Sequence, residues 1–511
     1  MNTTTISVKQ KWLITAAVML ATIMQVLDST IVNVALHHMQ SSLGANPDQI
    51  TWTLTSYLVS SAIFMPLTGY FTDRLGQKKY LLLSIGGFVI ASAFCGASTY
   101  LNELIAFRLL QGVFGAALVP LSQAILTTIF PPQQRGMAMA IWGIGVMLGP
   151  ILGPTLGGYL TEVSSWRWTF YVNLPIGIFT WLLVWRVVPD SDRKERTMDW
   201  RGFIFLSLFI SAFQFIMDRG NQSDWFESYS INLSALISIL GLIGFIVHCR
   251  HKKVHPLFDL SIFKDSNFTL SSLVIGIFAL GMFSAMVIQP LMLVSLLNFP
   301  VLTAGLVMAP RGISSMVAML IVAKLAQKID QRLLITFGTF INIFACNVAS
   351  HYPINVDIWG LVWPQLLQGF GLGFIFAPLS QIAFSTLAPK LRAEAAGIFS
   401  LLRTLGSSIG IAIVITVYTR SGQVAWNQLG RWINPFKPTT YQYLQHINLT
   451  PQSPEGIAIL AQTVGQQAQM AAFVNAYDFI MWCFVMMLPF IFLLKKPPAI
   501  ASGAPVESVG E

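Results

Sequence analysis

Long runs of hydrophobic residues, separated by short polar segments, dominate the chain. A run of about 20 apolar residues can cross the hydrocarbon core of a bilayer as a helix, and a helix satisfies its own backbone amides in lipid. The pattern predicts fourteen membrane-spanning helices. They are expected at residues 12–35, 52–71, 80–99, 104–129, 137–160, 168–188, 202–217, 230–249, 268–290, 301–323, 333–350, 358–387, 395–418 and 470–494.

The composition supports an all-α integral membrane protein. Hydrophobic residues make up 54% of the 511 residues and charged residues only 10%, whereas about 25% of residues in soluble domains are charged. The 30 Lys and Arg exceed the 21 Asp and Glu, but they lie between apolar runs. We therefore expect them to orient the helices in a lipid bilayer, and we expect no nucleic-acid partner.

The placement of Lys and Arg predicts the topology. With the N-terminus inside, the basic residues concentrate in the even-numbered loops and at both termini. Cytoplasmic loops of membrane proteins carry such an excess. We expect both termini of this multi-pass protein in the cytoplasm.

An internal repeat relates two parts of the chain. The residues Leu109–Gly112 and Pro120–Gln123 recur, in the same order, as Leu366–Gly369 and Pro378–Gln381. The repeat places the fourth predicted span opposite the twelfth. Related halves around a site near the middle of the bilayer are typical of transporters.

The repeat predicts the domain organisation. Residues 1–190 are expected to form a six-helix bundle, residues 191–265 two linking transmembrane helices, and residues 266–511 a second six-helix bundle. The second bundle is expected to contain a long outward-facing loop at 419–469, rich in Gln, Asn and Pro, with a partly helical segment near Pro454–Gln469 as the alternative.

Asp28 is a carboxylate in the outer half of the first span, flanked by Gln25 and Asn33. A charge inside the bilayer is costly, so it should face a cavity or a partner. We interpret Asp28 as a proton carrier or a site for a cationic substrate, with Gln25 and Asn33 as accompanying polar groups. The alternative is a structural carboxylate.

Four further ionisable residues fall within predicted spans. Arg108 stands early in the fourth span, and its counterpart in the repeat is the neutral Gln365. Arg108 could tune a nearby carboxylate or form a structural ion pair. Asp478 is a weaker candidate for proton coupling or substrate binding, and the roles of Arg311 and Arg403 stay open.

The fifth span carries a stripe of glycines with two prolines, namely Gly145, Gly149, Pro150, Gly153 and Pro154. Glycines four residues apart make a smooth face that another helix can approach closely, and the prolines remove amide donors. We expect a hinge or seal at the interface between the halves, or else tight packing alone.

The short loop between the second and third spans contains Asp73, Arg74 and Gly76. Its turn glycine and mixed charges suit a tight cytoplasmic connection that docks on a helix end. We expect a conformational latch; the alternative is plain anchoring of the topology by positive charge.

The chain lacks the common catalytic and nucleotide-binding motifs. It contains no phosphate-binding loop, no HExxH, no GxSxG and no paired Cys and His ligands. The four cysteines lie in apolar segments and are expected to be packing residues. We therefore expect no enzymatic activity, no metal and no cofactor, with an ion gradient as the energy source.

Several motifs resemble those of the major facilitator superfamily. The loop Gly69–Lys79, Arg108 with Gln111 and Gly112, and the stretch Gly145–Gly158 are similar to its loop, fourth-helix and antiporter motifs. Leu27–Ala35 resembles the first-helix motif of the fourteen-helix drug:proton antiporter branch, although His37 replaces the usual proline.

Three further segments narrow the resemblance to the EmrB-type multidrug export permeases: Asp218–Phe226, His255–Leu260 and Trp363–Gly369. It implies proton-driven export of hydrophobic drugs or toxic small molecules across a bacterial inner membrane. It also implies assembly with a periplasmic adaptor protein and an outer-membrane channel. The rival hypotheses are an exporter dedicated to one endogenous metabolite or siderophore, and a membrane sensor that no longer transports.

Overall fold

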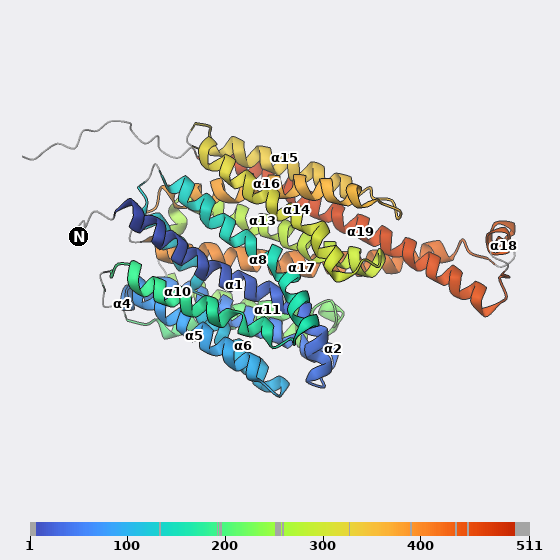
Figure 1. The fold of residues 1–511 in the computed structure, drawn as a ribbon, viewed down its shortest axis with the longest axis horizontal. Helices are drawn as coiled ribbons and strands as arrows, with labels where there is room; N and C mark the ends of the chain where they lie inside the picture. Colours follow the sequence, from blue (N-terminus) through green and yellow to red (C-terminus); the bar gives the residue numbers. More distant parts are fainter. Residues whose placement is uncertain are drawn as a thin grey trace, which may run out of the picture.

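The computed structural model describes residues 7–495, except 132–133, 192, 194–196, 251–256, 258–259, 327, 389–390, 435–436 and 447–448. These residues form helices and connecting turns (Figure 1). The helices of the first half are α1 (Val8–Ser42), α2 (Pro47–Ile50), α3 (Trp52–Phe64), η1 (Met65–Leu67), α4 (Thr68–Leu75), α5 (Gln77–Ala97), α6 (Leu101–Gly115), α7 (Leu118–Ile129), α8 (Arg135–Val163), α9 (Trp168–Tyr171) and α10 (Asn173–Val187). The remaining helices are α11 (Trp200–Arg219), η3 (Trp225–Glu227), α12 (Tyr229–Arg250), η4 (Leu260–Lys264), α13 (Ser266–Leu291), η5 (Met292–Leu296), α14 (Val301–Leu325), α15 (Gln331–Ala349), α16 (Ile358–Ser385), α17 (Arg392–Gly430), α18 (Pro438–Gln445) and α19 (Pro454–Leu493).

Each predicted span falls on one helix or on two or three consecutive helices, so the all-α membrane prediction is confirmed. Among the described residues, 12 helices are long and apolar enough to cross a membrane. The other two predicted spans, 52–71 and 137–160, correspond to α3–η1–α4 and to α8. A count of fourteen crossings is consistent with this arrangement.

The second span is interrupted for a local reason. Pro66 lies in the 3₁₀ turn η1, between α3 and α4, and proline has no amide to continue the α-helical ladder. The turn from α4 to α5 then passes through Gly76 at φ +83°, a backbone conformation that residues with a Cβ rarely adopt.

The repeated segments lie on matching elements but differ in regularity. The first copy spans α6 and α7, which separate at residues 116–117, four residues before Pro120. The second copy runs along the continuous helix α16, which accommodates Pro378. The repeat is therefore one of sequence and position, with different local geometry in the two halves.

The helices pack into two groups (Figure 1). In the first, α1 contacts α7, α8 and α10, α3 contacts α6, and α5 contacts α6 and α10. In the second, α13 contacts α17 and α19, while α16 contacts α14 and α15. The two groups meet where α8 packs on α14 and where α4, η1 and α7 pack on α17. The domain boundaries at 190 and 265 stay predictions.

Helices α11 and α12 form a pair beside these groups. Helix α11 contacts both α3 and α17. Thr55 on α3 donates a hydrogen bond to Asp218 at 2.7 Å, and Ser408 on α17 donates one to Gln214 at 2.9 Å. In the most apolar stretch of α12 only 22% of the residues are buried inside the protein. We therefore expect α12 to face lipid.

The halves are in close contact at the end of the molecule where α1 begins. A Cβ atom at Gly69 on α4 would lie 2.9 Å from the Glu394 Cβ on α17. Arg392 donates a hydrogen bond to the Thr127 carbonyl at 3.1 Å. These contacts join the two halves directly, so this conformation is closed at that end.

The segment 419–469 is largely helical, and the expectation of a long loop is wrong in this respect. Helices α17 and α19 are 39 and 40 residues long, which at 1.5 Å per residue is roughly 60 Å each. They extend beyond the body as a hairpin, with the short helix α18 at its tip (Figure 1). Only the helical expectation near Pro454 is confirmed.

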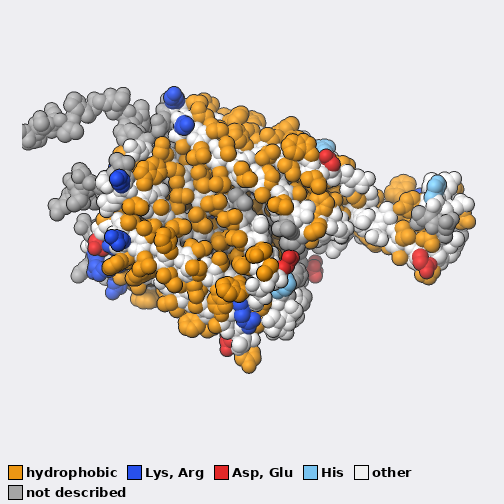
Figure 2. Space-filling model, viewed as in Figure 1, with side chains coloured by type: hydrophobic (Ala, Val, Ile, Leu, Met, Phe, Trp, Pro, Cys, Tyr) orange, Lys and Arg blue, Asp and Glu red, His pale blue; other side chains and the backbone are white. Residues whose placement is uncertain are grey.

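The surface of the body is apolar (Figure 2). Hydrophobic side chains cover most of the visible face, and Lys and Arg gather at the end where α1 begins. The apolar band is the surface expected for contact with lipid. By the positive-inside rule the basic end is the one expected in the cytoplasm, and this orientation stays a prediction.

The glycine stripe of α8 packs against α1. A Cβ atom at Gly149 would lie 2.8 Å from the backbone carbonyl carbon of Val26, and one at Gly153 would lie 2.2 Å from the Thr30 Oγ1. Thr30 also donates a hydrogen bond to the Gly149 carbonyl at 3.0 Å. The stripe therefore closes on a helix of its own half, while α8 also packs on α14 of the other half; the role of the stripe as a hinge or seal stays a prediction. Pro150 and Pro154 lie on α8, and their side chains are outside the described residues.

This packing makes a prediction about two glycines of the same stripe. At Gly145 the nearest atom to an added Cβ is the flexible Met19 Cε at 3.4 Å. Gly149→Ala should destabilise the protein by about 1–3 kcal/mol because it forces α1 and α8 apart, whereas Gly145→Ala should be neutral. Melting temperatures of the detergent-purified variants measure this. Equal losses in both would show that the α1–α8 approach at Gly149 is not tight.

Candidate functional site

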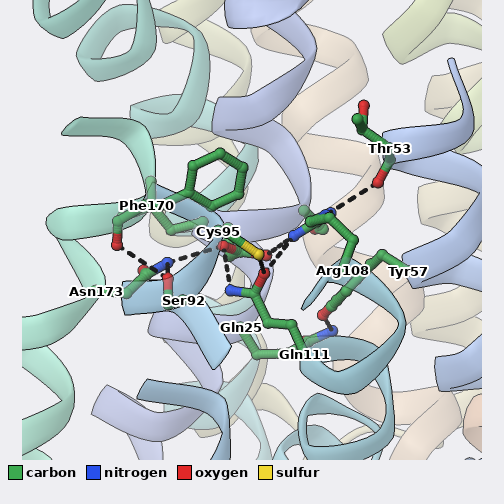
Figure 3. A network of polar contacts seen from close by, with 12 residues as sticks. Gln25, Thr53, Tyr57, Ser92, Cys95, Arg108, Gln111, Phe170 and Asn173 are labelled. Carbon is green, nitrogen blue, oxygen red and sulfur yellow. Dashed lines mark hydrogen bonds and ion pairs between the residues drawn. The ribbon is translucent and has the colours of Figure 1, made fainter. Parts of the chain in front are cut away.

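The candidate site surrounds Asp28, which lies on α1 inside the first group of helices. Figure 3 shows the polar network, with Arg108, Gln111 and Asn173 among its labelled side chains. Its closest polar partners come from α6 and α10, and further members come from α3 and α5. The side chains of Asp28 and of Arg108 on α6 are both 0% exposed. The structure therefore brings together the two intramembrane charges of the first half.

The carboxylate of Asp28 accepts hydrogen bonds on both oxygens. Oδ2 accepts from Arg108 Nη1 at 2.7 Å. Oδ1 accepts from Gln111 Nε2 at 2.9 Å and from Asn173 Nδ2 at 2.8 Å. This arrangement suits the deprotonated form, since an ionised carboxylate is acceptor-only.

Arg108 is held by contacts that do not depend on Asp28. Its Nε donates to the Thr53 carbonyl at 3.0 Å, and its Nη1 also donates to Gln111 Oε1 at 2.8 Å. The guanidinium carbon lies 4.2 Å from the centre of the Tyr57 ring, a distance at which a cation is attracted to the ring face. The Thr53 and Tyr57 contacts thus hold Arg108 in addition to its ion pair with Asp28.

A second layer of hydrogen bonds orients the first. Gln25 on α1 donates to the Tyr57 hydroxyl at 2.9 Å. Asn173 Nδ2 also donates to Ser92 Oγ at 3.1 Å, and Ser92 donates to the Phe170 carbonyl at 2.9 Å. The cluster thus ties α1, α3, α5, α6 and α10 together.

The cluster contains one carboxyl group, that of Asp28. Protonation of Asp28 removes a charge at the centre of a buried network, and Arg108 then becomes an uncompensated cation. Loss of one partner of a buried ion pair costs about 3–5 kcal/mol, so protonation must be accompanied by rearrangement or by access of water. A buried carboxylate with a fixed cation beside it is thus suited to couple protonation to a change of conformation.

The other candidate residues for proton coupling separate into two groups. Gln25 is buried and joins the cluster through Tyr57. Asn33 is exposed on α1, away from the cluster. Asp478 lies half-buried on α19 in the other group of helices, and in the described part of the chain it makes no ion pair. Only Gln25 and Arg108 therefore accompany Asp28 in the site.

Several members of the site were not predicted from the sequence, among them Asn173 and Tyr57. Asn173 is an isolated amide in an apolar run of the sixth predicted span, and it could have been recognised by that position. Tyr57 gave no comparable signal, because tyrosine is common in membrane helices. Its role depends on the packing of α3 against α6.

The loop between α4 and α5 docks on the segment that follows α10. The backbone amide of Gln77 donates to Ser191 Oγ at 2.7 Å, and a Cβ atom at Gly76 would lie 3.2 Å from the Ser191 carbonyl oxygen. Arg74 donates to the hydroxyl of Tyr70, and Asp73 is half-buried. The latch role of Asp73, Arg74 and Gly76 stays a prediction.

Other chemistry has little support in the described residues. No group of three or more His, Cys, Asp or Glu among them could hold a metal ion. All four cysteines are free thiols, and Cys95 donates a long hydrogen bond of 3.6 Å to Gln111 Oε1. The Asp28 cluster is therefore the site whose chemistry we pursue.

Comparison with known proteins places this geometry in context. The family described as the Major Facilitator Superfamily matches residues 18–411. The multidrug export protein EmrB of Escherichia coli K12 is 35% identical over 498 residues, which cover 96% of each chain. The fatty acid resistance protein FarB of Neisseria gonorrhoeae is 32% identical over 487 residues, covering 95% of this chain and 96% of its own.

A solved structure supports the fold. The proton:xylose symporter XylE superposes with a TM-score of 0.62 and covers 96% of both chains at 12% sequence identity. At this identity the likeness concerns the fold alone, and it agrees with the major-facilitator arrangement expected from the internal repeat.

The geometry of the cluster predicts a specific pattern of stability. Arg108→Gln should destabilise the protein by about 3–5 kcal/mol, because it leaves the buried Asp28 without its counter-charge. Adding Asp28→Asn to Arg108→Gln should recover much of that loss. Thermal unfolding of the single and double variants tests the coupling. Additive losses would mean that the two charges do not act as a pair.

Proposed function

This chain belongs to the major facilitator superfamily, and we propose that it exports hydrophobic drugs or other toxic small molecules in exchange for protons. The resemblance to EmrB-type export permeases is confirmed by a sequence identity of 35% in an alignment that covers 96% of the chain. The names of the relatives refer to multidrug export and fatty acid resistance. We place the protein in a bacterial inner membrane, with both termini in the cytoplasm.

The observation that carries the proposal is the fully buried ion pair of Asp28 and Arg108. An ionisable residue inside the bilayer is costly and is therefore usually functional. Asp28 would lose its proton when the pair forms and gain one when the pair opens. Arg108 would stay on Tyr57 and Thr53 in both states and so set the return position of Asp28.

The α1–α8 contact supplies a connection from this proton site to the interface between the halves. Val26 and Thr30 flank Asp28 on α1 and touch Gly149 and Gly153 on α8. Another side of α8 packs on α14 of the second half. A displacement of α1 on protonation would be transmitted through α8, because the two helices are in direct contact at the glycines.

Alternating access follows if the two protonation states favour different arrangements of the halves. The conformation described is closed at the end where α1 begins, through Glu394 and Arg392. A ligand shifts such an equilibrium only as far as its affinities for the two states differ. Exchange would therefore require that the proton and the substrate bind preferentially to opposite states.

We predict that Asp28→Asn abolishes export driven by a pH gradient. The substitution keeps the shape of the side chain but removes the group that titrates. Uptake of a fluorescent hydrophobic dye into inverted membrane vesicles, which corresponds to export, measures the effect. Size-exclusion chromatography of the purified variant checks that it is folded. Gradient-driven export by Asp28→Asn at the parent rate would show that Asp28 is not the proton carrier.

The hairpin of α17 and α19 is the part of the chain best placed to meet a partner. It projects from the end opposite to the start of α1 (Figure 1), and aromatic side chains are exposed on it, with Trp432 at 73%. Exposed aromatic residues often anchor protein interfaces. We propose that the hairpin docks a periplasmic adaptor, which would lead to an outer-membrane channel.

Cysteine cross-linking provides the test of docking. Cysteines at Trp432 and Tyr441 should cross-link to a co-expressed adaptor, because both side chains are exposed on the hairpin. A cysteine at Tyr229, which is 80% exposed at the start of α12, is the matched control and should not react. Removal of residues 426–462 should then lower resistance in whole cells but spare export in vesicles. Docking is wrong if the hairpin cysteines fail to cross-link and the deletion has no effect in cells.

A further inference from the structure

The second half contains a buried arginine without a counter-charge. Arg311 lies on α14 and is 7% exposed. Its Nη1 has no hydrogen-bond partner among the described residues, and no described carboxylate forms an ion pair with it. Arg108 in the first half is buried to a similar degree but is paired with Asp28. The two halves therefore differ in whether their buried cation is neutralised.

The neighbours of Arg311 do not supply the missing charge. The nearest ionisable groups are Cys346 on α15 and Tyr477 on α19, which are neutral in their ordinary forms. Cys346 accepts a hydrogen bond from Gln368 Nε2 at 3.3 Å, and the Tyr477 hydroxyl donates to Gln289. Their hydrogen bonds are thus made with other residues, and the guanidinium stays uncompensated.

Arg311 lines a cavity between α8, α13, α14 and α16. Four methionines contribute to its wall: Met147 from α8, Met282 and Met286 from α13, and Met308 from α14. Methionine is flexible and polarisable, and surfaces rich in it adapt to varied apolar partners. The cavity combines one buried cation with an adaptable apolar wall.

The chemistry of this cavity favours one class of ligand. A buried charge without a partner is unfavourable, and within a membrane such a residue marks a substrate or ion pathway. Guanidinium binds carboxylate through two parallel hydrogen bonds. We propose that Arg311 binds the anionic head group of amphipathic substrates, chiefly carboxylates, while their apolar parts contact the four methionines. This assignment rests on the proposed export function.

The location of the cavity connects binding to the transport cycle. Met147 belongs to the first half, whereas Arg311 and the other three methionines belong to the second. The free volume is about 50 Å³, enough for a head group but well below the ~300–1,000 Å³ of drug-sized sites. The apolar part of a substrate requires the halves to separate, so binding favours an open state.

A second arginine adds to the positive character of this half. Arg403 lies half-buried on α17, and the described residues offer it neither a hydrogen bond nor an ion pair. Asp478 on α19 is the acidic candidate of this half, and it pairs with neither arginine in this conformation. An internal Arg311–Asp478 pair is therefore the outcome that the experiment must separate from ligand binding.

Three probes of matched shape test the assignment: phenylbutyrate, its neutral amide and the corresponding phenylalkyl ammonium. Binding is measured by calorimetry on the purified full-length protein in detergent. Arg311→Gln should weaken phenylbutyrate binding at least about tenfold, as expected for loss of a charged contact of about 1.4 kcal/mol. Binding of the amide should change little. Arg311→Lys should retain part of the phenylbutyrate affinity, and Asp478→Asn should leave it unchanged.

Melting temperatures of the empty variants supply an independent readout. If Arg311 is unpaired until a ligand binds, the melting temperature of ligand-free Arg311→Gln should be no lower than that of the parent, because the substitution removes an unpaired buried charge. Addition of phenylbutyrate should stabilise the parent but not the variant. A variant that melts lower and loses all three probes equally would make Arg311 structural, and a parent that binds all three probes equally would exclude an anion site.

The result is distinguishable from failure of the export function. If the parent exports neutral dyes through Asp28 but does not prefer phenylbutyrate, the anion site is wrong and the exporter stands. If Asp28→Asn exports normally while Arg311→Gln still loses phenylbutyrate selectively, the binding site stands and the proton mechanism is wrong.

Discussion

The arrangement of the first half depends on one buried ion pair. Asp28 and Arg108 are fully buried and 2.7 Å apart, and removing either charge leaves the other unpaired at a cost of about 3–5 kcal/mol. The additional contacts in the cluster stabilise that pair. Gln111 and Asn173 donate hydrogen bonds to the carboxylate, and the guanidinium lies over the ring of Tyr57. The relative positions of α1, α3, α6 and α10 follow from this requirement.

The internal repeat is used asymmetrically. Gln111 and Gln368 occupy matching positions, and each contacts a cysteine on the preceding helix, Cys95 and Cys346 respectively. In the first half the glutamine also binds a carboxylate, whereas in the second half the nearby cation has none. One half is thus suited to a proton and the other to an anionic ligand. Helix α8 lies between them, since it packs on both α1 and α14.

Hydropathy was sufficient to predict the helices, because each crossing requires a long apolar segment. Asp28 and Arg108 were recognisable as costly intramembrane charges, but their pairing depends on how α1, α3, α6 and α10 are placed around one another, which the sequence does not show. The continuation of α17 to Gly430 was mistaken for a loop because the chain becomes polar after residue 418. The signals at the other end of the hairpin agree with the helix expected there, since Ser453 caps α19 and Pro454 occupies its first turn. The helix that packs on the glycine stripe could not be predicted, because glycine spacing indicates a close contact between helices but not which helix makes it.

The central claim is that Asp28 exchanges a proton as substrate binds. The most direct test measures the pH of a weakly buffered solution of purified protein as a transported dye is added, over a series of starting pH values. The account predicts proton release by the parent protein and none by Asp28→Asn at equal dye binding. Equal release by both proteins, or dye binding by the parent without release at any starting pH, would contradict it.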